Sequence, residues 1–254
     1  MIKLLKIEWY KLRPYTIFWV FTGLYSILLF GAYYVVKKAT SSEEFSLGFP
    51  MKWQGLTYIA GWLNPFLVLL TILYTTNEYT FNTFRQNVID GLSRTEIFIS
   101  KVMVHFLFSL YSTILVVLLG TLFSALFSKS FNAENYFNDF YFIGIHFLKC
   151  FTFFSIAYML SLLFKKGIIS IIALVILYIG DSLVSWIITN PIFDMLPFAS
   201  MSNLINNPLL EQITKELTPE TPPPLWVFVL VVIAYLILFN AASWFLLNKR
   251  DLKG

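Results

Sequence analysis

The chain has 254 residues, of which 58% are hydrophobic and 13% are charged, and its formal net charge is +4. Soluble domains carry about 25% charged residues, so this composition excludes a globule that is exposed to water on all sides. The positive charge does not indicate nucleic-acid binding, because in a membrane protein the placement of Lys and Arg is what matters. We therefore expect an all-α, polytopic membrane protein whose partners include the lipid bilayer and no nucleic acid.

The N-terminal stretch, residues 1–14, is predicted to form an amphipathic helix that lies in the membrane interface. Leu5, Trp9 and Leu12 fall on one helical face, while the lysines of this stretch lie off that face. Such a helix directs its lysines toward anionic headgroups and places a Trp ring at headgroup depth. Pro14 ends the pattern. The alternative is an irregular tail.

Six stretches have the length of about 20 mostly apolar residues that is needed to cross about 30 Å of hydrocarbon. They are residues 16–36, 56–76, 97–127, 140–164, 168–189 and 225–247. Of the 18 Lys and Arg residues, twelve lie in or beside the segments that share a side with the N-terminus, and six lie on the other side. This bias and the even number of spans predict one transmembrane domain with both termini in the cytoplasm.

Residues 77–94, between the second and third spans, have the pattern of a short structured element. Phe81, Phe84, Val88 and Leu92 recur at helical spacing, and polar or charged residues fill the other face. We therefore expect an amphipathic helix on the cytoplasmic side.

Two local signals end this helix and begin the next one. Gly91 can adopt a left-handed backbone without a Cβ clash, which is typical of a helix end. Ser93 and Glu96 stand in the S-x-x-E arrangement of a capping box, in which each side chain accepts a hydrogen bond from the other residue's amide. The pattern predicts a sharp break followed by a capped long helix.

The segment 190–224, between the fifth and sixth spans, is expected to be extracytoplasmic. Three consecutive prolines at 222–224 favour a stiff, extended approach to the last span. The segment is either a re-entrant or interfacial lid, or a long surface loop with one helix. The helix would be interrupted by Pro208, and its apolar face would consist of Leu204, Ile205, Leu209, Ile213 and Leu217.

The sequence contains no motif for nucleotide binding, catalysis or metal ligation. A GxxxxGK[ST] loop is absent, and so are GxSxG, HExxH and CxxC. The one cysteine, Cys150, excludes an internal disulfide, and the two histidines, His105 and His146, are expected to pack rather than to catalyse. We predict no catalytic, cofactor-binding or metal-binding residue, and no enzymatic activity in this chain.

Two charged residues interrupt apolar spans, Lys149 in the fourth and Asp181 in the fifth. Counted at about 1.5 Å per residue, both fall in the outer half of the bilayer at similar depth. Charges within spans are costly and mark functional candidates. One hypothesis is an ion pair between them. The alternative is that Lys149 extends to the outer headgroups and Asp181 is satisfied by Ser182, Ser185 or water.

The region after the second span resembles the permease subunits of ABC transporters of the type-2 exporter class. In that family an acidic residue is followed by a basic or polar helix, a Gly-x-Ser-Arg-like turn and a Lys early in the next span. The residues that match this order are Glu78, Arg85, Gln86, Gly91, Ser93, Arg94 and Lys101. The layout of about 250 residues, six spans and an interfacial N-terminal helix is also similar.

The resemblance implies a division of labour between subunits. A separate ATP-binding subunit would bind and hydrolyse ATP, and a second permease chain, identical or related, would complete the passage in the plasma membrane of a prokaryote. The residues implied to couple this chain to the ATPase are Glu78, Phe81, Arg85, Gln86, Asp90, Gly91, Ser93 and Arg94. For Glu78 and Arg94 the alternative is a solvated charge.

Other functions remain open beside ATP-driven export. The first alternative is a stand-alone channel or secondary transporter, although the sequence shows no inverted repeat and few polar residues at mid-membrane. A membrane-embedded assembly or immunity factor is a further alternative. The cargo is left open, because it depends on a cavity formed between two chains.

Overall fold

The computed structural model is all-helical, with no strand in the residues it describes, which are 2–40, 53–127, 136–137, 139–188, 192–207 and 223–249. This confirms that the fold is all-α, as predicted. The helices are α1 (Ile2–Leu12), α2 (Thr16–Thr40), α3 (Trp53–Thr80), α4 (Thr83–Ile89), α5 (Arg94–Phe127), α7 (Tyr141–Phe164), α8 (Gly167–Ile187), the 3-10 helix η1 (Phe193–Met195), α9 (Pro197–Asn203) and α11 (Leu225–Lys249).

Within these residues, six helices are long and apolar enough to cross a membrane, as predicted. Their apolar parts are Thr16–Lys38, Trp53–Thr80, Arg94–Phe123, Tyr141–Phe164, Gly167–Ile187 and Leu225–Lys249. They overlap all six predicted spans and differ from them by a few residues at most ends. The chain therefore has the layout of a multi-pass membrane protein.

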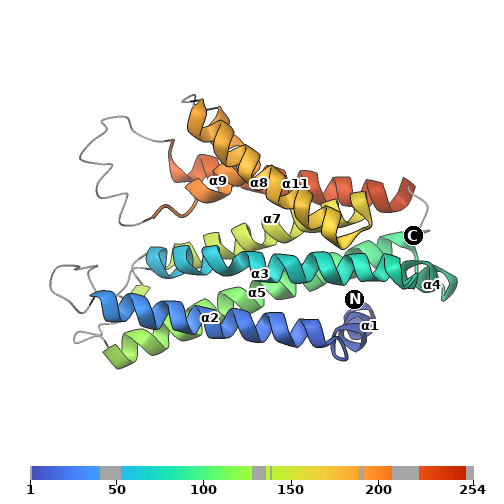
Figure 1. The fold of residues 1–254 in the computed structure, drawn as a ribbon, viewed down its shortest axis with the longest axis horizontal. Helices are drawn as coiled ribbons and strands as arrows, with labels where there is room; N and C mark the ends of the chain where they lie inside the picture. The colour runs from blue at the N-terminus through green and yellow to red at the C-terminus, as the bar shows by residue number, and fades with distance from the viewer. Residues whose placement is uncertain are drawn as a thin grey trace.

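The long helices form an antiparallel bundle in which α7 is the most buried span and α8 the least buried (Figure 1). The most extensive packing of α7 is against α3 and α11, followed by α5. Helix α8 crosses the bundle obliquely (Figure 1). Consequently most of the α8 surface is left to the surroundings of the protein.

Helices α3 and α5 pair in an antiparallel register that holds along their length. At one end Gly120 allows close approach, because a Cβ atom there would lie 2.7 Å from the Trp53 ring. At the other end Tyr74 accepts a hydrogen bond of 3.2 Å from Lys101 Nζ. This register places the end of α3 beside the start of α5.

Helix α1, helix α4 and the last turn of α11 gather at one end of the bundle (Figure 1). Helix α9 lies beside α8 and α11 away from that end. Leu204 and Ile205, expected to open the apolar face of a short helix, instead follow the end of α9, outside any helix, and are buried in the core. The rest of that predicted face, Leu209, Ile213 and Leu217, lies outside the described residues.

Candidate functional site

Four charged side chains from three helices meet at the end of the bundle where α1 and α4 lie. Lys101 of α5 is fully buried, and its Nζ lies 2.8 Å from a Glu8 oxygen of α1 and 2.7 Å from a Glu78 oxygen of α3. Lys11 of α1 closes the arrangement, with Nζ at 3.0 Å from Glu78 and 3.5 Å from Glu8. We refer to Glu8, Lys11, Glu78 and Lys101 as the charged cluster.

Neutral side chains complete the surroundings of Glu8. The Tyr74 hydroxyl donates to one carboxylate oxygen, and the Ser100 hydroxyl donates to the other at 3.0 Å. Burial raises the pKa of the Glu8 carboxyl, but the charges of Lys101 and Lys11 and the hydrogen bonds from Lys101 and Tyr74 outweigh it and lower the pKa to about 2. Glu8 is therefore a carboxylate at neutral pH.

The charged cluster joins α1 to the bundle. Two carboxylates and two ammonium groups give no net charge, which limits the large cost of removing ions from water. The Lys101 ammonium also lies 4.2 Å from the centre of the Tyr74 ring, within cation–π distance. Helix α1 is thus fixed to α3 and α5 by directional contacts as well as by the burial of Leu12.

Helix α4 begins later than the sequence pattern predicts, because α3 continues to Thr80. Asn82 then takes a left-handed conformation with φ of 54°, which Asn tolerates better than most residues. This break resets the phase of the helix. Phe84 and Asn87 are buried, whereas Phe81 and Val88, expected on the same face as Phe84, are exposed.

Phe84 anchors α4 to the rest of the protein. Its ring is fully buried, with its centroid 4.6 Å from that of Tyr79 at the end of α3. Phe81 and Ile89 point away from this contact and are each 73% exposed, and Val88 is 37% exposed. We call Phe81, Val88 and Ile89, with the exposed polar residues Arg85, Gln86 and Asp90 between and beside them, the α4 surface.

The break and cap after α4 have the predicted geometry. Gly91 has φ of 97°, in the left-handed region. The Ser93 amide donates to the Glu96 carboxylate at 2.8 Å, and the Glu96 amide donates to the Ser93 hydroxyl oxygen at 3.2 Å. These reciprocal bonds confirm the capping box, and they fix the start of α5.

Arg94 connects the start of α5 to the end of α11. Its guanidinium donates to the carbonyl oxygens of Leu247 at 3.0 Å and Asn248 at 2.7 Å. Carbonyl groups at a helix C-terminus lack partners within the helix, so a cation is favourable there. Arg94 is therefore an internal contact rather than a solvated charge.

The structure does not keep the residues expected to couple to an ATPase in one group. Gly91, Ser93 and Arg94 form the break, the cap and the contact with α11. Glu78 belongs to α3 and is buried in the charged cluster, which corrects its expected place on the polar face of the short helix. Phe81, Arg85, Gln86 and Asp90 are all exposed, on α4 or directly beside it.

Glu8 was not singled out by the sequence, although a signal existed. It stands on the same helical face as Leu5 and Leu12, an acidic residue within an otherwise apolar stripe. Its partner Lys101 is 93 residues away, so only the packing of α1 on α5 identifies the contact.

A second group of polar side chains lies in the interior of the bundle, and we call it the buried polar network. The Tyr25 hydroxyl is 2.6 Å from the Ser112 hydroxyl, which is 3.0 Å from His146 Nε2. Asn64 donates to the sulfur of Cys150 at 3.0 Å, and that sulfur lies 3.4 Å from the same His146 nitrogen. These buried groups come from α2, α3, α5 and α7 and bond to one another, while the buried Nδ1 of His146 has no hydrogen-bond partner in the described ranges.

His105 packs between aromatic rings, as expected for a structural histidine. Its ring centroid lies 5.0 Å from that of Tyr158 and 6.4 Å from that of Phe154. In the part of the chain that the structure describes, no three His, Cys, Asp or Glu side chains are grouped to hold a metal ion.

Lys149 and Asp181 do not form an ion pair. Asp181 instead accepts hydrogen bonds from the amides of Phe198 at 2.7 Å and Ala199 at 3.1 Å, at the start of α9. Lys149 extends across Gly61 of α3, where a Cβ atom would lie 3.6 Å from its Nζ. Of the two hypotheses for these charges, the ion pair is wrong, because the Asp181 carboxylate bonds to amides at the start of α9 instead.

Comparison with known proteins identifies a family without assigning a function. No curated protein matches the chain. The sequence does match, over residues 17–253, the family described as "Protein of unknown function (DUF2705)". The matched region includes nearly all of α2 and every described helix after it. The chain therefore belongs to the DUF2705 family.

Proposed function

We propose that this chain is the permease subunit of an ATP-driven ABC transporter, an exporter of the type-2 class, with a separate ATP-binding subunit docked on the α4 surface. The observation that carries the proposal is the exposure of Phe81 and Ile89, each 73%, on a short anchored element between two spans. In this proposal the element and both termini face the cytoplasm of a prokaryote.

The composition of the α4 surface supports a protein partner. An exposed apolar group rimmed by polar side chains is typical of an interaction site. Phe and Arg are enriched at protein interfaces, and Phe81 and Arg85 are both exposed here. The apolar side chains lie outside the six apolar spans or at their margin, so lipid is not their expected neighbour.

The contacts around α4 would let a movement of the partner reach the spans. Phe84 holds α4 to α3, the Ser93–Glu96 cap fixes the start of α5, and Arg94 joins that start to α11. A coupling device requires an element whose displacement repacks its neighbours. The short α4 with its two flanking breaks, at Asn82 and Gly91, meets that requirement.

A second permease chain is the remaining partner in this proposal. Helix α8 is the least buried span, and Ile176 and Trp186 on it are 63% and 80% exposed. Either lipid or another chain would cover this surface in the membrane. The cargo would pass between the two chains.

The test is co-purification from host membranes in a mild detergent. We expect a subunit with a GxxxxGK[ST] loop to accompany the chain, and the complex to hydrolyse ATP. Replacing Phe81→Ser and Ile89→Ser together should reduce association at least about tenfold, which corresponds to about 1.4 kcal/mol. The matched control is Ile192→Ser, which is 70% exposed but lies between α8 and α9.

Two outcomes would contradict the proposal. One is that no ATP-binding subunit accompanies the intact chain. The other is that the double variant and the control retain association equally. Variants of Glu78 and Arg94 are unsuitable for this test, because both side chains make internal contacts whose loss would disturb the fold.

The buried polar network is the observation that favours the alternative, a stand-alone channel or secondary transporter. Polar groups buried inside a transmembrane bundle are costly and often mark ion or proton pathways. Ser112 and His146 lie at the centre of this group. If the purified chain alone in proteoliposomes carries an ion flux that Ser112→Ala and His146→Phe abolish, the alternative replaces the first proposal.

A further inference from the structure

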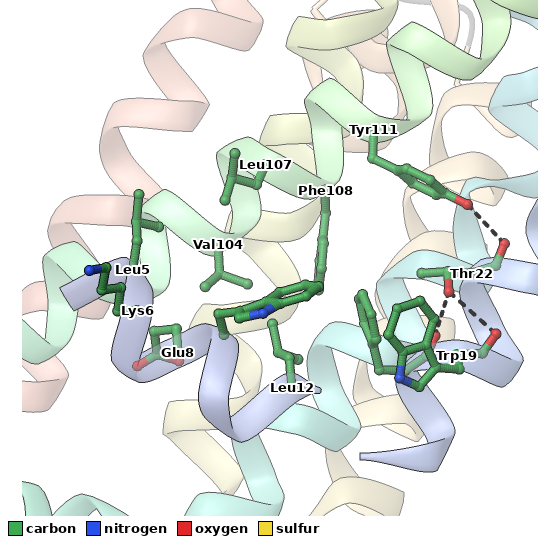
Figure 2. Close-up of a pocket in the computed structure, with 12 residues that line it drawn as sticks. Leu5, Lys6, Glu8, Leu12, Trp19, Thr22, Val104, Leu107, Phe108 and Tyr111 are labelled. Carbon is green, nitrogen blue, oxygen red and sulfur yellow. Dashed lines mark hydrogen bonds between the residues drawn. The ribbon is translucent and has the colours of Figure 1, made fainter. Parts of the chain in front are cut away.

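An apolar groove of about 500 Å³ lies between α1, α2 and α5. Figure 2 shows Leu5 and Leu12 of α1 on one wall, Val104, Leu107 and Phe108 of α5 on another, and Trp19 of α2 at the far edge. This volume is within the range of about 300–1,000 Å³ that is usual for sites that bind small molecules.

Three polar residues that border the groove, Thr22, Tyr111 and Glu8, already have partners. Thr22 donates to the carbonyl of Phe18 at 2.7 Å, and Tyr111 donates to the carbonyl of Thr22 at 3.1 Å (Figure 2). Glu8, which also borders the groove, is held in the charged cluster. No polar ligand group is therefore required inside the groove, and an apolar occupant fits it best.

The groove is continuous with the outer apolar surface of the spans. Leu107 in its wall is 45% exposed, and its neighbours on α5, Phe106, Leu110 and Ile114, are between 37% and 47% exposed. In a bilayer these side chains face hydrocarbon, and water is not a stable filling for an apolar cavity. Lipid acyl chains lie at this surface in a bilayer, and they are therefore the expected occupant of the groove.

Charge at the end of the groove selects the headgroup. Lys6 is an exposed residue that lines the end of the groove beside Leu5 (Figure 2), and it forms no ion pair with any residue that the structure describes. Lys3 and Arg13 are exposed nearby in sequence, whereas Glu8 is buried and paired. This imbalance is complementary to an anionic headgroup.

We propose that the groove binds one acyl chain of an anionic phospholipid of the bilayer, with Lys6 contacting its phosphate. The lipid occupies the space between α1, α2 and α5, beside the face of α1 that carries Leu5, Glu8 and Leu12. This inference goes beyond the proposed transport function and does not depend on an ATPase partner.

The experiment uses the full chain in nanodiscs of mixed phosphatidylcholine and phosphatidylglycerol. A small fraction of one lipid at a time carries a photoactivatable diazirine on an acyl chain, and the labelled peptides are identified by mass spectrometry. We expect labelling by phosphatidylglycerol to concentrate at Val104–Phe108 of α5. Leu107→Trp, which fills the groove, should reduce it at least about fivefold, as for the loss of about 1 kcal/mol of binding.

Matched variants separate the groove from the general lipid surface. Ile114→Trp makes the same kind of change about two turns along α5, outside the groove, and should leave the labelling unchanged. Leu5→Trp fills the groove from α1 and should repeat the loss, so that the result does not depend on one variant folding. Lys6→Glu should reduce labelling by phosphatidylglycerol and leave labelling by phosphatidylcholine unchanged.

Three results would overturn the proposal. Labelling that Leu107→Trp and Leu5→Trp leave intact would show that the groove is not the site. Labelling spread evenly over α5, α8 and α11 would show a general lipid surface. Equal labelling by the two lipids in the native chain would remove the assignment of an anionic lipid.

Discussion

The charged cluster and the charges at Lys149 and Asp181 differ in how the fold neutralises them. In the charged cluster Lys101 contacts two carboxylates within 2.8 Å, and each carboxylate has a second cation from Lys11. Asp181 is half-buried and, among the described residues, accepts hydrogen bonds from backbone amides of α9 alone. Lys149 meets no carboxylate among the described residues.

The difference follows from where helices end. The charged cluster lies where α1 folds against the end of α3 and the start of α5, so three helix ends bring their side chains together. Asp181 lies at mid-helix in α8, and the nearby α9 begins there with unpaired amides. Two charged residues at similar depth in neighbouring spans therefore need not pair. The position of the nearest helix end is a better guide to the partner of a charged side chain.

The largest effect is expected for Lys101→Met. The variant leaves Glu8 and Glu78 as buried carboxylates that share only Lys11. Removing one partner from a buried ion pair typically costs about 3–5 kcal/mol, because the remaining charge stays buried. The measurement is the free energy of unfolding in mixed micelles, or the melting temperature in detergent.

The control for this prediction is Lys3→Met, the same change at an exposed lysine of α1. It should alter the unfolding free energy by no more than about 0.5 kcal/mol. Adding Glu8→Gln and Glu78→Gln to Lys101→Met should recover part of the loss, since the uncompensated charges are then gone. Equal stability of Lys101→Met and Lys3→Met would show that the charged cluster adds nothing to the fold.

The next largest effect is the loss of stability at acid pH that protonation of the Glu8 carboxylate should cause. Its pKa in the folded protein is about 2, below the ordinary value of 4.5. A lowered pKa means that the folded state binds protons less readily than the unfolded state, so its stabilisation is complete above about pH 4.5 and is lost as the pH falls toward about 2. The contribution is at most about 3 kcal/mol.

The measurement compares the melting temperature of the native chain with that of Glu8→Gln as the pH is lowered. The native chain should be the more stable at neutral pH, and the gap should narrow below about pH 4.5. The glutamine keeps the shape of the side chain and cannot titrate. A gap that stays constant down to about pH 3 would exclude Glu8 as the titrating group.

Local and long-range features differed in how far the sequence could predict them. The six spans follow from composition, and the Ser93–Glu96 cap depends on residues three apart, so both were predicted. The break at Asn82 was not, since its left-handed backbone is one option among several for that residue. Beyond this break Asn87 is buried in place of Val88, while Phe84 is buried as expected.

The charged cluster required information that the sequence pattern does not hold. Glu78 and Lys101 were both recognised, but as members of a polar segment and a span start rather than as contacts. Their approach depends on the antiparallel register of α3 and α5, which close packing at Gly120 helps to define. A short helix does lie between the second and third spans, but it begins later than predicted, and its role in coupling stays a prediction.

A smaller effect is expected for Asp181→Ala. The variant removes both acceptors for the amides of Phe198 and Ala199, and loss of such a cap costs about 0.5–2 kcal/mol. Hydrogen exchange of these two amides should accelerate about tenfold for each 1.4 kcal/mol. Asp181→Asn keeps one carbonyl oxygen and should show a smaller acceleration, while Ser182→Ala, on the exposed side, should show none.

The smallest effect is expected for Lys149→Met, although this residue carries a charge within a span. Methionine has a similar length and can occupy the space over Gly61 without placing an ammonium group against α3. Lys149 is partly buried, and replacing a charge within a span that lacks a carboxylate partner with an apolar side chain is neutral or stabilising. We expect the melting temperature to stay level or to rise slightly.

A charge exchange tests the same point. The double variant Lys149→Asp, Asp181→Lys should be no more stable than Asp181→Lys alone, because the two side chains do not meet. Full recovery in the double variant would instead mean that the two side chains meet in the membrane, and it would remove the contrast with the charged cluster.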